Sequence, residues 1–402
     1  MAYSQQVAEQ AYGSGGYGGG AYLDPLAQGR ETTAVNRGLV PLPPPIFSGM
    51  KLKGDVQLGN LVLNTIDENN VIWVCTDVQG WWGHPDPEIP DVTRGWRDGS
   101  YDARGRWQAR QITLTGSFFP PDPDYVSAAR DHLVESTALV YSGAWLKTVE
   151  SPTKAAYVRL SGRPEISTVN ARGRTDFSIG LRAADPIRYS WNDDDEEGYD
   201  VVTLACKNTS TGATGQTTIT NVGNTDVTMF IEVTGPIVGP ATIYNQATDE
   251  TLTINGTLRS GSTFSINNKA LTNNVATLTT SATHDFVADD QVYVTGVDTT
   301  FDGVYTITAV TTNTFSYDRT ATNVVSTGAT GAVTRAADVL EIDTYERAVS
   351  INGLTSGARA KLETLVDWVT LVPGNNLITF TDAGAASSTS SLAVYYRSGW
   401  IG

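Results

Sequence analysis

Apolar and polar residues alternate with a period of two along most of this chain, and this alternation predicts β-strands. Between residues 56 and 119 the alternating apolar positions are Val56 and Leu58, Leu61 and Leu63, Trp73 and Cys75, and Ile112 to Phe118. Further along they are Val158 and Leu160, Phe177 to Ala183, Val227 to Val233, Leu340 and Ile342, Val349 and Ile351, and Leu392 to Tyr396. The pattern therefore predicts a mainly β protein.

One segment has helical spacing instead. The run Pro-Pro-Asp-Pro-Asp124 supplies helix-start residues, and Val126, Ala129 and Leu133 follow at the spacing of one helix face. We expect this helix to stop at Gly143, because glycine is the usual residue just past a helix end. Residues 46–191 are thus predicted to form a β-domain with one α-helix.

The segment 192–200 is acidic and predicts a solvated linker. Asp193, Asp195 and Glu197 alternate as in the first half of an EF-hand loop, but Leu204 stands where that loop needs a bidentate glutamate. The EF-hand pattern therefore fails. We prefer a linker to a metal site, and we expect neither a metal nor a cofactor.

Residues 201–266 and 337–402 alternate like the strands of one β-sandwich, and the sequence between them is different. Residues 267–336 are rich in threonine and carry their own alternating pairs, such as Val292 with Val294 and Phe315 with Tyr317. The flanking sequences GSTFSI and ADVLEID look like consecutive strands of the sandwich. This predicts a β-module of about 70 residues inserted at a loop tip, where insertions are tolerated.

Composition agrees with this organisation. The 402 residues are enough for roughly two to three domains, and a net charge of -16 gives a surface that repels nucleic acid. An acidic channel through which DNA slides is compatible with that charge. Cys75 and Cys206 are too few for a disulfide-stapled scaffold and are expected to be reduced. The chain has neither a signal-peptide pattern nor an apolar run long enough for a membrane helix, so we expect no membrane insertion.

Residues 1–45 read as an extended, low-complexity arm rich in Gly, Tyr and Pro. Such a segment cannot bury enough apolar surface to fold alone. Its tyrosines Tyr12, Tyr17 and Tyr22 are candidates for contact with a neighbouring subunit, since tyrosine makes a large contact at low entropic cost. An arm that lies on its own domain is the alternative.

The segment Gly80–Trp107 is the strongest candidate for a functional surface. It holds four of the nine tryptophans, together with several arginines. Trp, Tyr and Arg are the residues that most often anchor protein interfaces. We predict an assembly loop whose arginines pair with Asp across a subunit interface. The predicted interface residues are Trp81, Trp82, Arg94, Trp96, Arg97, Arg104, Arg106 and Trp107.

Catalytic motifs do not stand out. The sequence has no G-x-S-x-G, HExxH or Walker pattern, and His84, His132 and His284 are too scattered for a metal cluster. A glycosidase needs two carboxyls across a cleft, and Asp98 and Asp102 beside two tryptophans are the best local pair. No enzyme-like scaffold surrounds that loop, so we expect no catalytic residues and no enzymatic activity.

Several segments, taken in order, resemble the distal tail proteins of long-tailed bacteriophages, of the type that infects actinobacteria. The resemblance covers about residues 46 to 402 apart from the insert, and it rests on the ordered set rather than on one motif. The insert resembles a small β-module that recurs in phage tail proteins. The segments are RWQARQITLTGSFF from Arg106, YVRLSGRPEI from Tyr157, FSIGLRAADPIRYS from Phe177, TNVGNTDVTMFIEVTGPI from Thr220, ADVLEIDTYERAVSING from Ala337, WVTLVPGNNLITFT from Trp368 and YYRSGW from Tyr395.

The resemblance implies a tail-tube-like first domain that assembles as a sixfold ring and encloses the DNA channel. It implies a galectin-like second domain that points outward and serves as a hub for host-attachment proteins. The implied partners are identical subunits, the tail tube protein on one face and a tail-tip or baseplate hub protein on the other. Receptor-binding proteins or host glycans would lie outside, and DNA would pass without sequence-specific binding.

By the same resemblance, the protein belongs in the virion, at the tail tip, after assembly in the bacterial cytoplasm. The arm is longer than the family pattern, which leaves its partner open. Two alternatives to the structural function remain. One is a carbohydrate-binding adhesin that acts through the sandwich or the insert, and the other is a cell-wall glycosidase.

Overall fold

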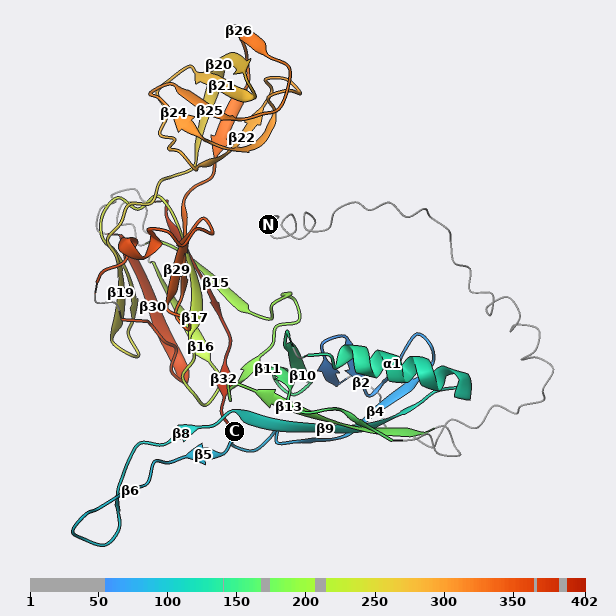
Figure 1. Ribbon diagram of the computed structural model, residues 1–402. Helices are drawn as coiled ribbons and strands as arrows, with labels where there is room; N and C mark the ends of the chain where they lie inside the picture. Colours follow the sequence, from blue (N-terminus) through green and yellow to red (C-terminus); the bar gives the residue numbers. More distant parts are fainter. Residues whose placement is uncertain (1–54, 140, 168–173, 207–214, 365–366, 383–388) are drawn as a thin grey trace, which may run out of the picture. The chain divides into compact units, whose positions relative to one another are not determined.

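The structure, a computed structural model, describes residues 55–139, 141–167, 174–206, 215–364, 367–382 and 389–402. The predicted arm, with Tyr12, Tyr17 and Tyr22, lies outside these residues. The described chain is mostly strand with one α-helix, so the predicted mainly β fold class is confirmed. Its strands enclose three separate hydrophobic cores (Figure 1). Within these ranges, none of the helices has the length and hydrophobicity of a membrane span.

The first core belongs to an 11-stranded sheet in the order β2-β1-β10-β11-β13-β9-β4-β3, with β12, β14 and β32 paired beside this path. Its last strand, β32, pairs with β14 through Arg188 and Trp400, although the pattern placed residues 337–402 in the sandwich. The strands are β1 (Val56–Leu58), β2 (Leu61–Leu63), β3 (Thr65–Ile66), β4 (Ile72–Gln79), β9 (Arg110–Phe119), β10 (Ala144–Thr148), β11 (Lys154–Leu160), β12 (Glu165–Ile166), β13 (Thr175–Ala183), β14 (Arg188–Ser190) and β32 (Gly399–Trp400).

Trp73 lies in the middle of this core. Its ring centroid is 5.0 Å from that of Phe118 and 6.5 Å from that of Phe177. Gly116 makes this packing possible, because a Cβ at that position would lie 2.4 Å from both the Val74 carbonyl oxygen and the Phe177 ring. A side chain at position 116 would therefore displace either a strand or an aromatic ring.

The α-helix α1 (Val126–Ser136) follows a 3-10 turn, η1 (Pro123–Tyr125). Its buried face is the predicted one, formed by Val126, Ala129 and Leu133. The predicted stop at Gly143 is wrong. The helix ends at Ser136, where Thr137 is the C-cap and its hydroxyl donates to the Leu133 carbonyl at 2.8 Å. The helix therefore ends at a threonine whose hydroxyl bonds to the last turn, before the chain reaches the glycine at position 143.

The second core lies between two antiparallel sheets that form a sandwich. Ile231, Ile243 and Phe380 are among its fully buried side chains. A 3-10 turn, η2 (Ala358–Lys361), adds Ala358 to this core. One sheet has the order β15 (Asp200–Ala205), β31 (Ser391–Tyr396), β17 (Met229–Thr234), β28 (Val339–Asp343) and β29 (Ala348–Ile351). The other has the order β16 (Gln216–Asn221), β30 (Gly374–Asp382), β18 (Ala241–Asn245) and β19 (Glu250–Ile254).

The third core belongs to the inserted β-module, where Phe301, Phe315 and Tyr317 are buried. His284 packs into the same module with its ring 4.7 Å from that of Phe286. The first strand, β20, already begins at Ser262 and pairs there with Arg335. The strands are β20 (Ser262–Thr272), β21 (Val275–Thr280), β22 (Gln291–Thr295), β23 (Gly303–Thr306), β24 (Ala309–Val310), β25 (Thr314–Asp318), β26 (Val324–Gly328) and β27 (Ala332–Arg335).

The acidic segment 192–200 forms a hydrogen-bonded turn. The Asp195 carboxylate accepts bonds from the backbone amides of Glu197 and Tyr199, at 2.9 and 3.2 Å. Arg397 donates to the carbonyl oxygen of Glu197. Across the part of the chain that the structure describes, no group of three or more His, Cys, Asp or Glu residues could hold a metal ion.

A cluster of ion pairs lies where the chain passes between the sandwich and the module. Arg259 binds Asp290 at 2.6 Å and Asp338 at 3.1 Å. Arg335, whose side chain is almost completely buried, binds Asp285 at 3.0 Å and Asp338 at 3.1 Å. Arg259 and Asp338 flank the module in sequence, whereas Asp285, Asp290 and Arg335 belong to it. We call these five residues the junction cluster.

We expect acid to destabilise the contacts of the junction cluster between the module and the sandwich. Burial alone would raise the pKa of Asp338, but hydrogen bonds from Arg259 and the charges of both arginines outweigh it and lower that pKa. The pKa of Asp285 is also lowered, since the hydroxyl of Ser262 and the charge of Arg335 outweigh its burial. A carboxylate with a lowered folded pKa stabilises the fold above its unfolded pKa, about 3.9 for Asp, and loses this effect as the pH falls.

We therefore expect backbone amide protection at residues 259–262 and 335–338 to stay constant from about pH 7 to pH 5 and to fall below about pH 4. The measurement is hydrogen exchange, corrected for the intrinsic pH dependence of the exchange rate. Strands β17 and β31 of the sandwich are the internal reference. Equal protection of the joint at pH 3 and pH 7 would contradict the prediction.

Candidate functional site

The Trp-rich segment forms a long two-stranded ribbon between β4 and β9 (Figure 1). Near its base, β5 (Pro87–Glu88) pairs with β8 (Arg106–Trp107), and near its tip β6 (Val92–Thr93) pairs with β7 (Ser100–Tyr101). Each pair is a two-stranded sheet of its own. We call residues 80–107 the hairpin.

Two residues position the hairpin at its base. Gly80 has φ +82°, and a Cβ there would lie 2.1 Å from the Gln111 carbonyl oxygen, so only glycine allows the chain to leave the sheet at this point. Arg110 is buried and donates to the carbonyl oxygens of Gly80, Trp81 and Gly83, at 3.0, 3.1 and 2.7 Å.

Arg110 also ties the hairpin base to distant parts of the chain. It donates to the carbonyl oxygens of Pro186 at 3.0 Å and of Ile401 at 2.7 Å. Burial, and then the charge of Arg188, lower the pKa of Arg110 to about 10, which still leaves it charged at neutral pH. Sequence reasoning missed this arginine, because its acceptors are backbone atoms that no motif marks.

Trp81, predicted as an interface residue, is instead part of the first core. Its side chain is 0% exposed, and its indole nitrogen donates to the Glu150 carboxylate at 2.7 Å. The guanidinium of Arg188 lies 5.4 Å from its ring. A side chain with no exposed surface cannot contact a second subunit. The prediction for Trp81 is therefore corrected.

The rest of the hairpin presents large apolar side chains to solvent. Trp96 at the tip is 100% exposed, and Trp82 near the base is 59% exposed. Ile89, Val92, Tyr101 and Trp107 are exposed as well. The ring of Trp107 stacks on that of His84 at 5.3 Å, so His84 supports the ribbon rather than a catalytic group. An isolated two-stranded ribbon is marginally stable in water, which favours a surface that becomes covered by a partner.

The four predicted arginines, Arg94, Arg97, Arg104 and Arg106, lie exposed along the same ribbon. The guanidinium of Arg94 lies over the ring of Tyr101, 5.4 Å from its centroid. Among the residues that the structure describes, none of the four forms a salt bridge with a carboxylate. Their charges are therefore available to a partner.

Asp98 and Asp102, the carboxylate pair considered for glycosidase chemistry, are also exposed on this ribbon. Asp98 lies in the tip turn and Asp102 directly follows β7. Within the described residues both carboxylates therefore lie on the exposed surface of the ribbon, whereas glycoside hydrolysis requires two carboxyls across a cleft.

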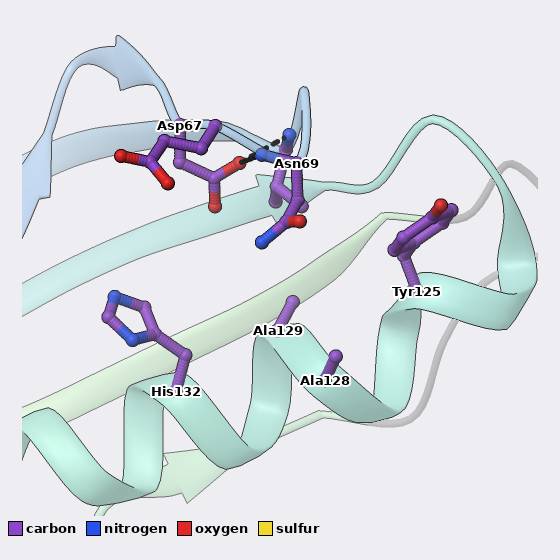
Figure 2. A pocket seen from close by; sticks show the side chains of 8 residues that line it. Asp67, Asn69, Tyr125, Ala128, Ala129 and His132 are labelled. Carbon is purple, nitrogen blue, oxygen red and sulfur yellow. Dashed lines mark hydrogen bonds between the residues drawn. The ribbon is translucent and has the colours of Figure 1, made fainter. Parts of the chain in front are cut away.

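A small cavity lies beside α1, at the opposite end of β4 from the hairpin. Its volume is about 230 Å³, and Figure 2 shows Asp67 and Asn69 facing the helix residues Tyr125, Ala129 and His132 across it. The Asp67 carboxylate holds the turn together, since it accepts from the amides of Asn69 and Val71 and from the Trp73 indole, each at 2.9 Å. We call this cavity the helix cavity. The sequence pattern did not indicate it.

Residues 302–400 match the family model described as "Siphovirus-type tail component, C-terminal domain". The matched part starts within the inserted module and runs through the last strands of the sandwich to β32. No curated protein matches the chain.

Three solved structures with some likeness to the chain are phage proteins. The SPP1 Dit (gp 19.1) protein, described as a paradigm of the hub adsorption apparatus in phages that infect Gram-positive bacteria, is 10% identical with a TM-score of 0.41 and covers 81% of this chain and 93% of its own. The phage P2 baseplate in its activated conformation with Ca is 8% identical with a TM-score of 0.33, and covers 82% of this chain and 91% of its own.

The phage p2 baseplate with Sr is 8% identical, with a TM-score of 0.25, and covers 78% of this chain and 89% of its own. At these identities and TM-scores, the likeness carries no conclusion about the function of this chain. The family-model match at residues 302–400 confirms the predicted resemblance to siphophage distal tail proteins for that part of the chain.

Proposed function

We propose that this chain is a structural distal tail protein that forms a ring between the phage tail tube and the tail tip or baseplate. The first domain, residues 46–191, is the tail-tube-like part that closes the ring. The sandwich is the galectin-like part that faces outward and carries host-attachment proteins. This proposal places the protein in the virion, at the tail tip, after assembly in the bacterial cytoplasm.

The hairpin is the observation that carries the ring proposal. Trp82 and Trp96 expose indole rings on a ribbon that has little packing of its own, and Arg94 and Arg97 have no carboxylate partner in the described chain. Buried aromatic and arginine anchors are what give subunit interfaces most of their binding energy. A ring subunit that reaches its neighbour with this hairpin would cover the apolar surface and pair the arginines.

The net charge of -16 supports a channel that DNA crosses without binding. A lumen lined by acidic groups repels the phosphate backbone, so the genome slides through with no sequence-specific contact. The proposed partners are therefore identical subunits, the tail tube protein on one face and a tip or baseplate hub protein on the other. No catalytic step is part of this function.

The proposal predicts a ring whose formation depends on the hairpin tryptophans. Light scattering coupled to size exclusion, with negative-stain images of the peak, should show a closed oligomer with a central hole. Trp82→Ala combined with Trp96→Ala should shift the peak to monomer, because hot-spot tryptophans each contribute about 2 kcal/mol or more.

The control is Val325→Ala, since Val325 is 85% exposed on the inserted module and far from the hairpin in sequence. It should leave the ring intact. A monomeric parent protein at every concentration would contradict the ring proposal. A double variant that still forms rings would instead contradict the part given to the hairpin.

A further inference from the structure

The hairpin and the helix cavity lie at opposite ends of the same two strands. β4 begins directly after the turn 67–71 that lines the cavity, and it ends at Gln79, where the hairpin begins. β9 begins where the hairpin ends and leads at Phe119 into the turn before α1. The two strands pair from Ile72 with Phe119 to Gln79 with Thr113. β9 has 10 residues, so about 33 Å of strand separates the two features.

Two different surfaces at opposite ends of one sheet suit a head-to-tail contact between copies. A heterologous contact of this kind generates a ring when the rotation between copies closes. A contact between like surfaces would instead stop at a dimer. The arrangement along β4 and β9 therefore fits the ring of the proposed function, provided that one end recognises the other.

The size of the helix cavity fits a single side chain. Its volume of about 230 Å³ is below the roughly 300–1,000 Å³ of pockets for small-molecule ligands. Val71, Ala128 and Ala129 supply apolar walls, and the rings of Tyr125 and His132 stand at its sides. An aromatic side chain from outside would find both apolar contact and ring edges there.

The rim of the cavity is acidic. Asp67 and Glu68 line it, whereas Asp131 lies outside the lining, beside it on α1, directly before the lining residue His132. The carboxylates of Glu68 and Asp131 are exposed, and neither forms a hydrogen bond or ion pair through its side chain within the described ranges. Arg130, the arginine of α1, donates instead to the Ser167 carbonyl oxygen at 3.3 Å.

The hairpin tip has the complementary chemistry. Its sequence is Arg94-Gly-Trp-Arg-Asp-Gly99, so two arginines flank a tryptophan that is 100% exposed. The arginine charges exceed the single negative charge of Asp98. The arginine charges are opposite to the carboxylates in and beside the cavity, and the cavity lining of apolar walls and aromatic rings suits an indole ring.

We propose that Trp96 of one copy inserts into the helix cavity of the next copy, while Arg94 and Arg97 pair with Glu68 and Asp131. This inference rests on the proposed function, because it names the surface that the hairpin contacts in the ring. Trp96 is the buried anchor of the contact, and the charge pairs set its register. Each copy contributes one tip and one cavity, so every contact in a closed ring is the same.

Disulfide trapping tests the pairing of tip and cavity. The full-length chain, with the native Cys75 and Cys206 replaced by alanine, carries Gly95→Cys together with Ala128→Cys, so that the anchor Trp96 is kept, and is oxidised under mild conditions. A head-to-tail contact links successive copies, so a non-reducing gel should show a ladder of oligomers that collapses with reductant. Each single-cysteine variant should stop at a dimer or below. Gly95→Cys with Val325→Cys in the same background is the matched control and should give no ladder.

The outcomes separate this inference from the function on which it rests. A ladder supports the contact. Oligomers in light scattering without a ladder overturn the assignment of the helix cavity and leave the ring standing. A disulfide formed within a single copy overturns it too, because the hairpin then folds onto its own domain. A parent protein that never oligomerises overturns the proposed function itself.

Charge reversal gives a second test that does not depend on cysteines. The tip variant carries Arg94→Glu and Arg97→Glu, and the rim variant carries Glu68→Lys and Asp131→Lys. Asp67 is left unchanged because it holds the turn. Each variant alone should lose the oligomer peak, whereas an equimolar mixture should recover it, since each tip then meets a cavity of opposite charge. A mixture that stays monomeric would overturn the proposal.

Discussion

Arg335→Met is expected to destabilise the inserted module and its joint with the sandwich by about 3–5 kcal/mol. The side chain of Arg335 is 3% exposed, and its guanidinium donates to the Asp338 carboxylate, the Asp285 carboxylate and the Ser260 carbonyl oxygen. Removing one member of a buried ion-pair cluster leaves the others without compensation. Asp338, which is also buried, would then keep a single arginine partner.

The measurement is calorimetric unfolding of the full chain. Three separate cores are expected to give more than one transition, so the transition of the module must be assigned first. For a domain of about 70 residues, a loss of 3 kcal/mol lowers the melting temperature by roughly 12 °C or more. Arg163→Met is the matched control, because Arg163 is an exposed arginine. Equal melting of both variants would refute the importance of the junction cluster.

Trp81→Ala is expected to cost about 3–5 kcal/mol of the stability of the first domain, the range for truncating a buried aromatic side chain. The change removes a fully buried ring and leaves a cavity in the core. It also takes a hydrogen-bond donor from Glu150, which keeps hydrogen bonds from Thr148 and Lys154 and an ion pair with Arg188 at 4.0 Å. Arg188, which lies over the Trp81 ring, would lose that contact and stay buried.

The adjacent residue provides the control. Trp82→Ala removes the same side chain from a position that is 59% exposed, so its effect on the monomer should stay within about 0.5 kcal/mol. Chemical denaturation of the two variants, followed at a probe in the first domain, measures the difference. Ring formation should be lowered more by Trp82→Ala, whereas the stability of the first domain should be lowered more by Trp81→Ala. Similar destabilisation by both variants would show that Trp81 is not a core residue.

The candidate site could be predicted only in part from the sequence. The composition of the hairpin indicated an interface, and the exposure of Trp82, Trp96 and the four arginines is consistent with that prediction. It did not separate Trp81 from Trp82. Neighbouring residues in a strand face opposite sides, but the chain leaves the sheet at Gly80, and the alternation ends there. Glu150, distant in sequence, decides that Trp81 turns inward.

The sequence by itself determined the mainly β fold, the buried face of α1 and the resemblance to siphophage tail proteins. These follow from local periodicity and segment order, which a strand or helix expresses wherever it lies. Only the tertiary structure showed the hydrogen bonds from Arg110 to the hairpin base, the pairing of β32 with β14, and the helix cavity. Each of these depends on backbone atoms or side chains that are far apart in sequence. These contacts form only in the folded structure, so no local sequence pattern predicts them.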